Sequence, residues 1–293
     1  MFRPHADRSL SWSLFALSLV TASILGLIVL FIFKETLPAI SNPGLTRFVT
    51  DESWHPLENQ FGMLPMLWAT LACTLLAVLI ATPLGVGAAL YCQYFAPRAL
   101  VRPYRGVLTL LAGIPSVVFG FWGLTVLVPL IARVEPPGAS LLAASLILAI
   151  MILPTVALMS EAALIAVPTS YPTAAAALGL SQSATILKVL LPAAKSGVIA
   201  AVILATARAL GETMAVLMVS GNVVQTPTSL FAPIRTLTAN IALEMAYASP
   251  FHRASLFVSG LVLTVVIAAL AWIAHRAVTD RAVTDNAETV NAR

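Results

Sequence analysis

The chain of 293 residues is 59% hydrophobic and only 10% charged, whereas a soluble domain is about a quarter charged. This composition excludes a soluble enzyme or binding module, so most of the chain is expected to face lipid or other helices. The net charge of +4 does not indicate nucleic acid, because the basic residues are scattered at the ends of apolar segments, as in contacts with lipid headgroups.

Apolar segments long enough to cross a bilayer recur along nearly the whole chain. They cover residues 10–33, 63–91, 106–132, 138–160, 197–220 and 254–274. The first is too long for the apolar core of a signal peptide and ends without a small-residue cleavage site, so it is expected to be a retained anchor. The expected fold class is all-α, a polytopic membrane helix bundle with about six transmembrane helices.

Basic residues near the segment ends predict the orientation. The short loop before the third segment carries three arginines, Arg98, Arg102 and Arg105, and is expected to be cytoplasmic. Both chain ends and the long loop after the fourth segment then lie in the cytoplasm, and the acidic loop with Asp51, Glu52 and Glu58 lies outside. Prolines in the second and third segments predict kinks. They are Pro65, Pro83, Pro115 and Pro129.

A segment too long for a turn, residues 173–197, joins the fourth and fifth apolar segments. Ser181 is a plausible helix N-cap, and Ile186, Val189 and Leu190 recur after it at helical spacing beside a polar face. The pattern predicts a short amphipathic helix at the membrane surface. Periodicity alone leaves open a helix that only lies on lipid.

The same segment carries a spaced pattern of six residues. They are Ala174, Ala175, Gly179, Val189, Leu191 and Pro192. This pattern resembles the EAA loop of bacterial ABC import permeases, which implies a coupling helix that docks into a cleft on an ATPase subunit. The family glutamate would fall at Thr173, and the literal E-A-A at Glu161 has Val167 where glycine belongs. Gly179 permits a tight turn, and Pro192 is expected to stop the helix.

Two charged residues lie near the middle of the fifth segment, Arg208 and Glu212. Each costs ~2.5–3.5 kcal/mol on insertion scales. At i, i+4 they share one helix face, so a salt bridge that satisfies itself and locks the bundle is one interpretation. The other is an anion pathway. There the guanidinium fork of Arg208 holds a tetrahedral oxyanion. Glu212 either orients Arg208 or accepts a hydrogen bond from a protonated oxygen of the substrate, and Thr213 adds a hydroxyl.

The stretch RALGETMAV from Arg208, followed by GN, resembles the signature of the PstC-type permease subunit of the bacterial phosphate importer. GIPSVVFGFWGL, residues 113–124, is similar to that subunit's third-span motif, and we place Ser116 of this motif in the pathway as well. The resemblance covers about residues 63–274. It implies a type I ABC importer permease fold in which Arg208 and Glu212 take part in phosphate passage.

The resemblance also implies the assembly. It consists of PstC- and PstA-type permeases, two copies of an ATPase subunit and an external phosphate-binding protein, all at a bacterial inner membrane. Residues 234–248 are similar to the family's external loop, where Arg235, Asn240 and Glu244 would contact the binding protein or else form a solvated amphipathic face.

No catalysis is expected in this chain. It lacks G-x-x-x-x-G-K-[ST], so ATP would be hydrolysed by another subunit and no cofactor would bind here. No Ser/His/Asp, di-acid or metal-ligand set falls at one depth in the membrane. The four histidines lie far apart in the sequence, so no metal site is expected.

The sequence suggests three parts. Residues 1–62 comprise a cytoplasmic segment, the first transmembrane helix and an external loop. Residues 63–276 form a permease core of five helices with a coupling loop at 161–197. Residues 277–293 form a polar cytoplasmic tail that is expected to be disordered. Two alternatives remain: an ABC permease for another oxyanion or an organic phosphate, and an ion-coupled secondary transporter, which would be expected to show inverted repeats.

Overall fold

A computed structural model describes residues 4–41 and 45–291 of the chain. The described part is almost entirely helical, as the composition predicts, with one two-stranded hairpin. The long helices are α1 (Pro4–Ser41), α3 (Leu64–Tyr94), α4 (Arg98–Gly113), α7 (Leu141–Ile165), α11 (Lys195–Leu210) and α14 (Pro250–Asn291).

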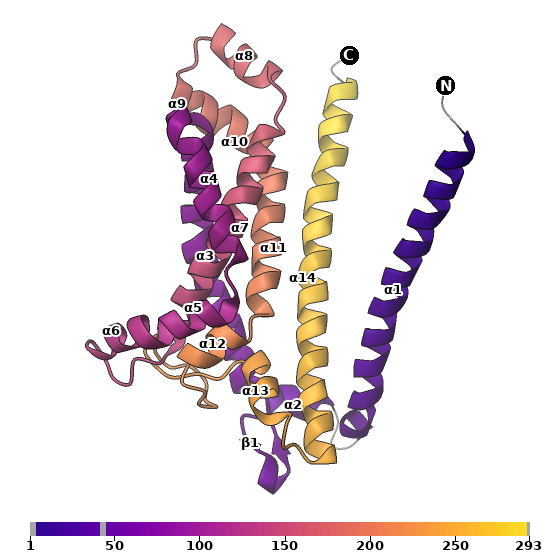
Figure 1. Cartoon of the computed structure of the whole chain (residues 1–293), viewed down its shortest axis with the longest axis vertical. Coiled ribbons are helices and arrows are strands. Elements are labelled where there is room, and N and C mark those ends of the chain that lie inside the picture. The colour runs from indigo at the N-terminus through magenta and orange to yellow at the C-terminus, as the bar shows by residue number, and fades with distance from the viewer. Residues whose placement is uncertain (1–3, 42–44, 292–293) are drawn as a thin grey trace.

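The long helices run along the longest axis of the molecule (Figure 1). Helices α3, α4, α7 and α11 form a bundle, α14 packs beside α11, and α1 packs on α14 at the outer edge. The most apolar stretch of α1 is 0% buried, as expected for a helix that faces lipid. Within the described residues, four helices are long and apolar enough to cross a membrane, and two bent pairs raise the number to six.

A line of small residues at every fourth position brings α3 against α7. These residues, all buried, are Ala69, Cys73, Ala77, Ala81, Gly85 and Ala89. A Cβ atom at Gly85 would lie 2.8 Å from the Cβ of Val156 on α7. Small side chains at i, i+4 spacing leave a shallow helix face, and two backbones can approach across it, which is a common packing mode in membranes. α7 begins at Ser140, whose hydroxyl accepts the amide of Ala143 at 3.3 Å.

Two of the predicted spans are broken in the structure. In the third apolar segment, α4 ends at Gly113 and a second helical stretch runs from Ser116 to Ala132, at 93° to α4. This stretch comprises α5 (Ser116–Trp122), the π-helical turn η2 (Gly123–Leu127) and α6 (Val128–Ala132). Ile114 is extended, with ψ 130°, because the following Pro115 disfavours helical backbone before it. The proline thus breaks the span completely, where only a kink was expected.

The fifth segment is also interrupted. α11 ends at Leu210, and the short helix α12 (Met214–Val219) begins three residues further on. At its other end, α11 follows the loop helices ending at Ala193 with a bend of 67°. Arg208 and Glu212 therefore do not lie on one continuous helix, contrary to the i, i+4 expectation.

The end of the molecule opposite the chain termini is built from short elements. They are α2 (Leu45–Thr50), a hairpin of β1 (Trp54–His55), η1 (Pro56–Glu58) and β2 (Gln60–Phe61), and α13 (Leu237–Glu244). Their apolar side chains, including Phe48, Phe61 and Leu237, form a core cluster with Leu256 of α14. This cluster is separate from the main core between α3, α7 and α12.

The C-terminal residues differ from the prediction. The expected disordered tail is helical, since α14 continues from Pro250 to Asn291 without a break. The helix therefore crosses the proposed boundary between residues 276 and 277. The proposed boundary between residues 62 and 63 stays a prediction.

Candidate functional site

The break between α11 and α12 places the two predicted pathway charges. Gly211, Glu212 and Thr213 leave the helix, and the amide of Glu212 bonds back to the carbonyl of Ala209 at 3.2 Å. Irregular backbone at membrane depth is tolerated where it is buried in protein or lines a water-filled cavity. The break is therefore the part of this span that is best suited to a pathway.

Arg208 and Glu212 do not form the expected pair. Arg208 is exposed in this chain and has no ion-pair partner in the part of the chain that the structure describes. Glu212 is half-buried, and its Oε1 atom accepts the amide of Ala215 at 3.2 Å, which caps the start of α12. The interpretation of a salt bridge that satisfies itself does not describe this structure, and the guanidinium is free for another anion.

The two broken spans meet through their short helices, α5 and α12. A Cβ atom at Gly120 of α5 would lie 2.9 Å from the Cα of Ala215, and one at Gly123 would lie 2.8 Å from the Cγ1 of Val219. Glycine permits this close approach of two backbones. Ser116, half-buried, is the first residue of α5, and Thr213, also half-buried, directly precedes α12 and bonds to the carbonyl of Gly211 at 3.3 Å.

A hydrogen bond ties the break to α13. The hydroxyl of Thr238 donates to the carbonyl of Glu212 at 2.8 Å. The next amide back, that of Leu237, donates to the hydroxyl of Thr70 on α3 at 3.1 Å. The position of the break therefore depends on α13 as well as on its own span.

The three predicted contacts for a binding protein point inward. Arg235 Nη1 donates to Glu244 Oε1 at 2.7 Å and to Asn240 Oδ1 at 3.1 Å, and its Nε donates to the carbonyl of Asn222 at 2.9 Å. Asn240 and Glu244 are 0% and 7% exposed. The structure therefore counts against a direct contact between these side chains and an outside protein, because they are used to hold α13 in place.

Two further residues complete this buried cluster. Trp54 Nε1 donates to Glu244 Oε2 at 2.9 Å, and His252 Nε2 lies 2.8 Å from the same oxygen. One carboxylate thus joins the hairpin, α13 and α14. Neither Trp54 nor His252 was predicted from the sequence as a partner of Glu244. No local pattern could have shown the Trp54 contact, because 190 residues separate the two in the chain.

The predicted coupling loop has the expected local structure. α8 (Ser170–Ala177) ends in a turn at Gly179, whose φ of +72° requires glycine, and the hydroxyl of Ser181 caps α9 (Gln182–Thr185) as predicted. The π-helical turn η3 (Ile186–Leu190) and α10 (Leu191–Ala193) follow. Pro192 does not end the helical stretch, since the bend comes after Ala193. Residues 161–165 belong to α7, so the loop itself is shorter than expected.

The loop presents apolar side chains to solvent. Leu178 is 80% and Leu187 60% exposed. A hollow of about 350 Å³ is lined by Tyr171, Ala174, Ala175 and Val189, among others. Among the pattern residues, Ala174, Gly179 and Pro192 are exposed, Val189 and Leu191 are half-buried, and Ala175 is buried. This surface is suited to docking another protein.

Thr173 and Glu161 differ in environment. Thr173, where the family has glutamate, is exposed, and its hydroxyl donates to the carbonyl of Thr169 at 2.8 Å. Glu161 is 4% exposed and accepts Arg105 Nε at 2.9 Å and Nη2 at 2.7 Å, which joins α7 to α4. The literal E-A-A is therefore part of the bundle and not of the loop, in agreement with the glycine-to-L-P spacing.

A family model described as "Binding-protein-dependent transport system inner membrane component" matches residues 81–283. The chain belongs to this family. It is thus an inner-membrane permease subunit of an ABC importer, which works with a binding protein and with a separate subunit that hydrolyses ATP.

Named relatives match most of the permease. The phosphate transport system permease protein PstC of Mesorhizobium japonicum is 35% identical over 282 residues, covering 89% of this chain and 86% of that protein. The probable ABC transporter permease protein YqgH of Bacillus subtilis is 39% identical over 259 residues, covering 86% and 83%. A chain of the inward-facing MetNI methionine ABC transporter has a TM-score of 0.61 at 20% identity, covering 78% of this chain and 99% of that one. The expected type I permease fold is confirmed.

Proposed function

We propose that this permease passes inorganic phosphate across the cytoplasmic membrane, with Arg208 as the cation that meets the anion on its way. The observation that carries the proposal is the free guanidinium of Arg208 beside a broken span, without an ion-pair partner among the described residues. Relatives that are named phosphate transport permeases support the choice of anion.

The two carboxylate oxygens of Glu212 suit a protonated oxyanion. Oε1 is occupied by the amide of Ala215, and Oε2 takes no hydrogen bond within the described chain. A hydrogen phosphate carries an O–H that can donate to this free oxygen, while its other oxygens accept from Arg208. Sulfate has no such proton near neutral pH, so the same carboxylate would repel it. Thr213 and Ser116, at the two breaks, add hydroxyls.

The transport cycle follows alternating access. ATP binding closes two copies of the ATPase subunit, the loop around Gly179 moves with them, and the break at Arg208 opens outward to receive phosphate. Hydrolysis resets it inward. The site has to be weak, because an anion held tightly by Arg208 would not leave. No cofactor bound by this chain is needed, since ATP is used by the partner.

A PstA-type permease completes the pathway, and a phosphate-binding protein delivers the anion from outside. The chain termini would lie in the cytoplasm. In support, α8–α10 lies at the same end as the start of α1 and the end of α14 (Figure 1), and basic residues such as Arg98, Arg102 and Lys188 lie in or beside elements of that end.

The test is uptake of radiolabelled phosphate, with excess sulfate as competitor, in cells that lack their own phosphate importers and carry this permease with its partners. Arg208→Gln should abolish uptake at equal membrane abundance, and Arg208→Lys should retain part of it. Arg133→Gln is the matched control, because Arg133 is exposed and lies at the end of α6. Uptake that survives Arg208→Gln would refute the pathway, and uptake of sulfate but not phosphate would identify a permease for another oxyanion.

A further inference from the structure

We propose that the hairpin Trp54–Phe61 is the docking element for the external binding protein. Leu57 would supply the apolar contact. The polar rim would consist of Glu58 at the tip and of Asp51 and Glu52 at the base of the hairpin. The partner is a solute-binding protein with a basic surface and an apolar hollow for Leu57. Dependence on some binding protein comes with the family. The proposal rests on the proposed function for the choice of a phosphate-binding protein and for the orientation that puts the hairpin outside.

Leu57 is 101% exposed, the highest value among the large apolar side chains of the described chain. Most of the other exposed ones lie on the long helices, whose surfaces are expected to face lipid or other helices. Leu57 lies instead in η1 at the tip of the hairpin, which projects beyond α2 and α13 at the end opposite α8–α10 (Figure 1). Covering a fully exposed leucine by a partner removes its whole apolar side chain from water, which is favourable.

The base of the hairpin is fixed while its tip is bare. Trp54 and Phe61 are 5% and 7% exposed, and their rings meet edge to face at 5.5 Å between centroids. Trp54 is bonded to Glu244, and Asn59, with φ +56°, closes the tip by donating its amide to the carbonyl of Pro56 at 3.2 Å. An element that is already ordered loses little conformational entropy on binding.

Close packing fixes the hairpin to the segment before it. The amide of Gly62 donates to the carbonyl of Ser53 at 2.9 Å, and a Cβ atom at Gly62 would lie 2.3 Å from the carbonyl oxygen of Asp51. The tip and the acidic residues therefore keep a constant relative position, which a specific docking surface needs.

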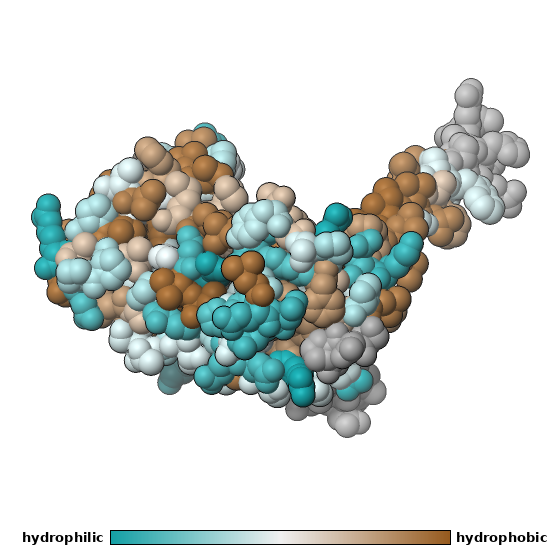
Figure 2. All heavy atoms as spheres, turned by 90° about the horizontal axis from the view of Figure 1, so that it is seen from below, coloured by the Kyte–Doolittle hydropathy of each residue, from teal (hydrophilic) through white to brown (hydrophobic). Residues whose placement is uncertain are grey.

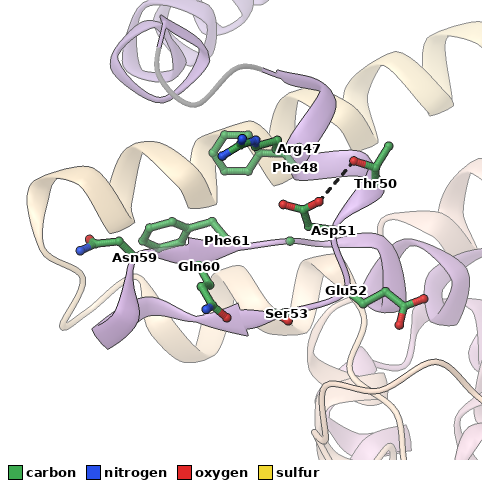
Figure 3. A pocket seen from close by; sticks show the side chains of 10 residues that line it. Arg47, Phe48, Thr50, Asp51, Glu52, Ser53, Asn59, Gln60 and Phe61 are labelled. Atoms are coloured by element: carbon green, nitrogen blue, oxygen red, sulfur yellow. Dashed lines mark hydrogen bonds between the residues drawn. The ribbon is translucent and has the colours of Figure 1, made fainter.

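The surface of the hairpin is hydrophilic and carries three acidic residues, with Glu58 at the tip and Asp51 and Glu52 at the base. Asp51, Glu52 and Glu58 are exposed. An open hollow of about 520 Å³ lies beside the hairpin, lined by Asp51, Glu52, Asn59 and Gln60 with Arg47 as its basic member (Figure 3). Seen from this end, hydrophilic side chains cover much of the middle of the molecule (Figure 2). A basic partner would be attracted and oriented by this rim.

Two other occupants fit less well. A lipid surface would take up an apolar tip, but Glu58 beside Leu57 and the two acidic residues at the base of the hairpin would be repelled by anionic headgroups. A neighbouring permease would lie beside the helices, whereas the hairpin projects along their axis (Figure 1). A protein that approaches from outside the membrane meets the hairpin first.

The test uses the full transporter in nanodiscs and the phosphate-loaded binding protein of the same organism. We expect Leu57→Asp to raise the half-saturating concentration of binding protein for stimulation of ATP hydrolysis by about tenfold or more. Basal hydrolysis should be unchanged, because the side chain of Leu57 is fully exposed. Val134→Asp is the matched control, since Val134 is 76% exposed and lies after α6, away from the hairpin. No change with Leu57→Asp, or an equal change with Val134→Asp, would overturn the proposal.

A double reversal, Glu52→Lys with Glu58→Lys, tests the charge of the partner. It should weaken stimulation and flatten its dependence on salt. Tighter binding by this variant would overturn the basic partner. If the binding protein stimulates ATP hydrolysis by the wild-type transporter but no phosphate is taken up, the proposed substrate is refuted and the docking element is not.

Discussion

Replacing Glu244 by glutamine should destabilise the permease strongly, although the change is nearly isosteric. Glutamine retains one oxygen for Arg235, but it removes the negative charge and turns an amide N–H₂ toward the N–H of Trp54. Removing one partner of a buried ion pair costs ~3–5 kcal/mol. The side chain of Arg235 is 19% exposed, so partial hydration of the guanidinium places the expected loss near the lower limit, ~3 kcal/mol.

The decisive comparison is with the double variant Glu244→Gln, Arg235→Gln, in which both charges are removed. Arg235→Gln should cost less than Glu244→Gln, because Glu244 keeps Trp54 and His252 as partners. The double variant leaves no uncompensated charge, so its cost should fall short of the sum of the two single costs by ~1–3 kcal/mol. The assay is equilibrium unfolding of the purified permease in mixed micelles, followed by circular dichroism. Additive costs would refute the conclusion that the two charges stabilise each other.

Three further variants test packing, the loop and the second ion pair. Gly123→Ala should cost ~1–3 kcal/mol in the same unfolding assay, because its new methyl would meet side chains of α7 and α12 at 2.8 Å, whereas Gly87→Ala, with open space around it, should cost nothing. Gly179→Ala places a side chain on a residue with φ +72° and should therefore lower ATP-driven uptake at unchanged abundance. Uptake equal to that of wild type would contradict this prediction. Glu161→Gln should lower the free energy of unfolding by ~1–2 kcal/mol, because the carboxylate accepts two hydrogen bonds from the half-exposed Arg105. An equal loss in an Arg105→Met background would show that this ion pair is not the cause.

Local physical chemistry was enough to predict much of the permease. Apolar segments long enough to span a bilayer, the N-cap at Ser181 and the turn at Gly179 follow from hydropathy and backbone preferences, which depend on residues close in the chain. The location of the first break was also visible at Pro115, although its size was not. A missing amide shows where a helix is weakened, but how far the chain turns there depends on what the next helix packs against.

Tertiary structure alone decided how the charges are used. Arg208 and Glu212 have the spacing of a pair, yet they do not pair because α11 ends between them and Glu212 caps α12. Glu244 bonds to Trp54 across 190 residues of sequence. Such contacts depend on the packing of distant segments, and no local preference encodes them. The same packing turned the predicted docking residues inward and left the hairpin with Leu57 at the surface.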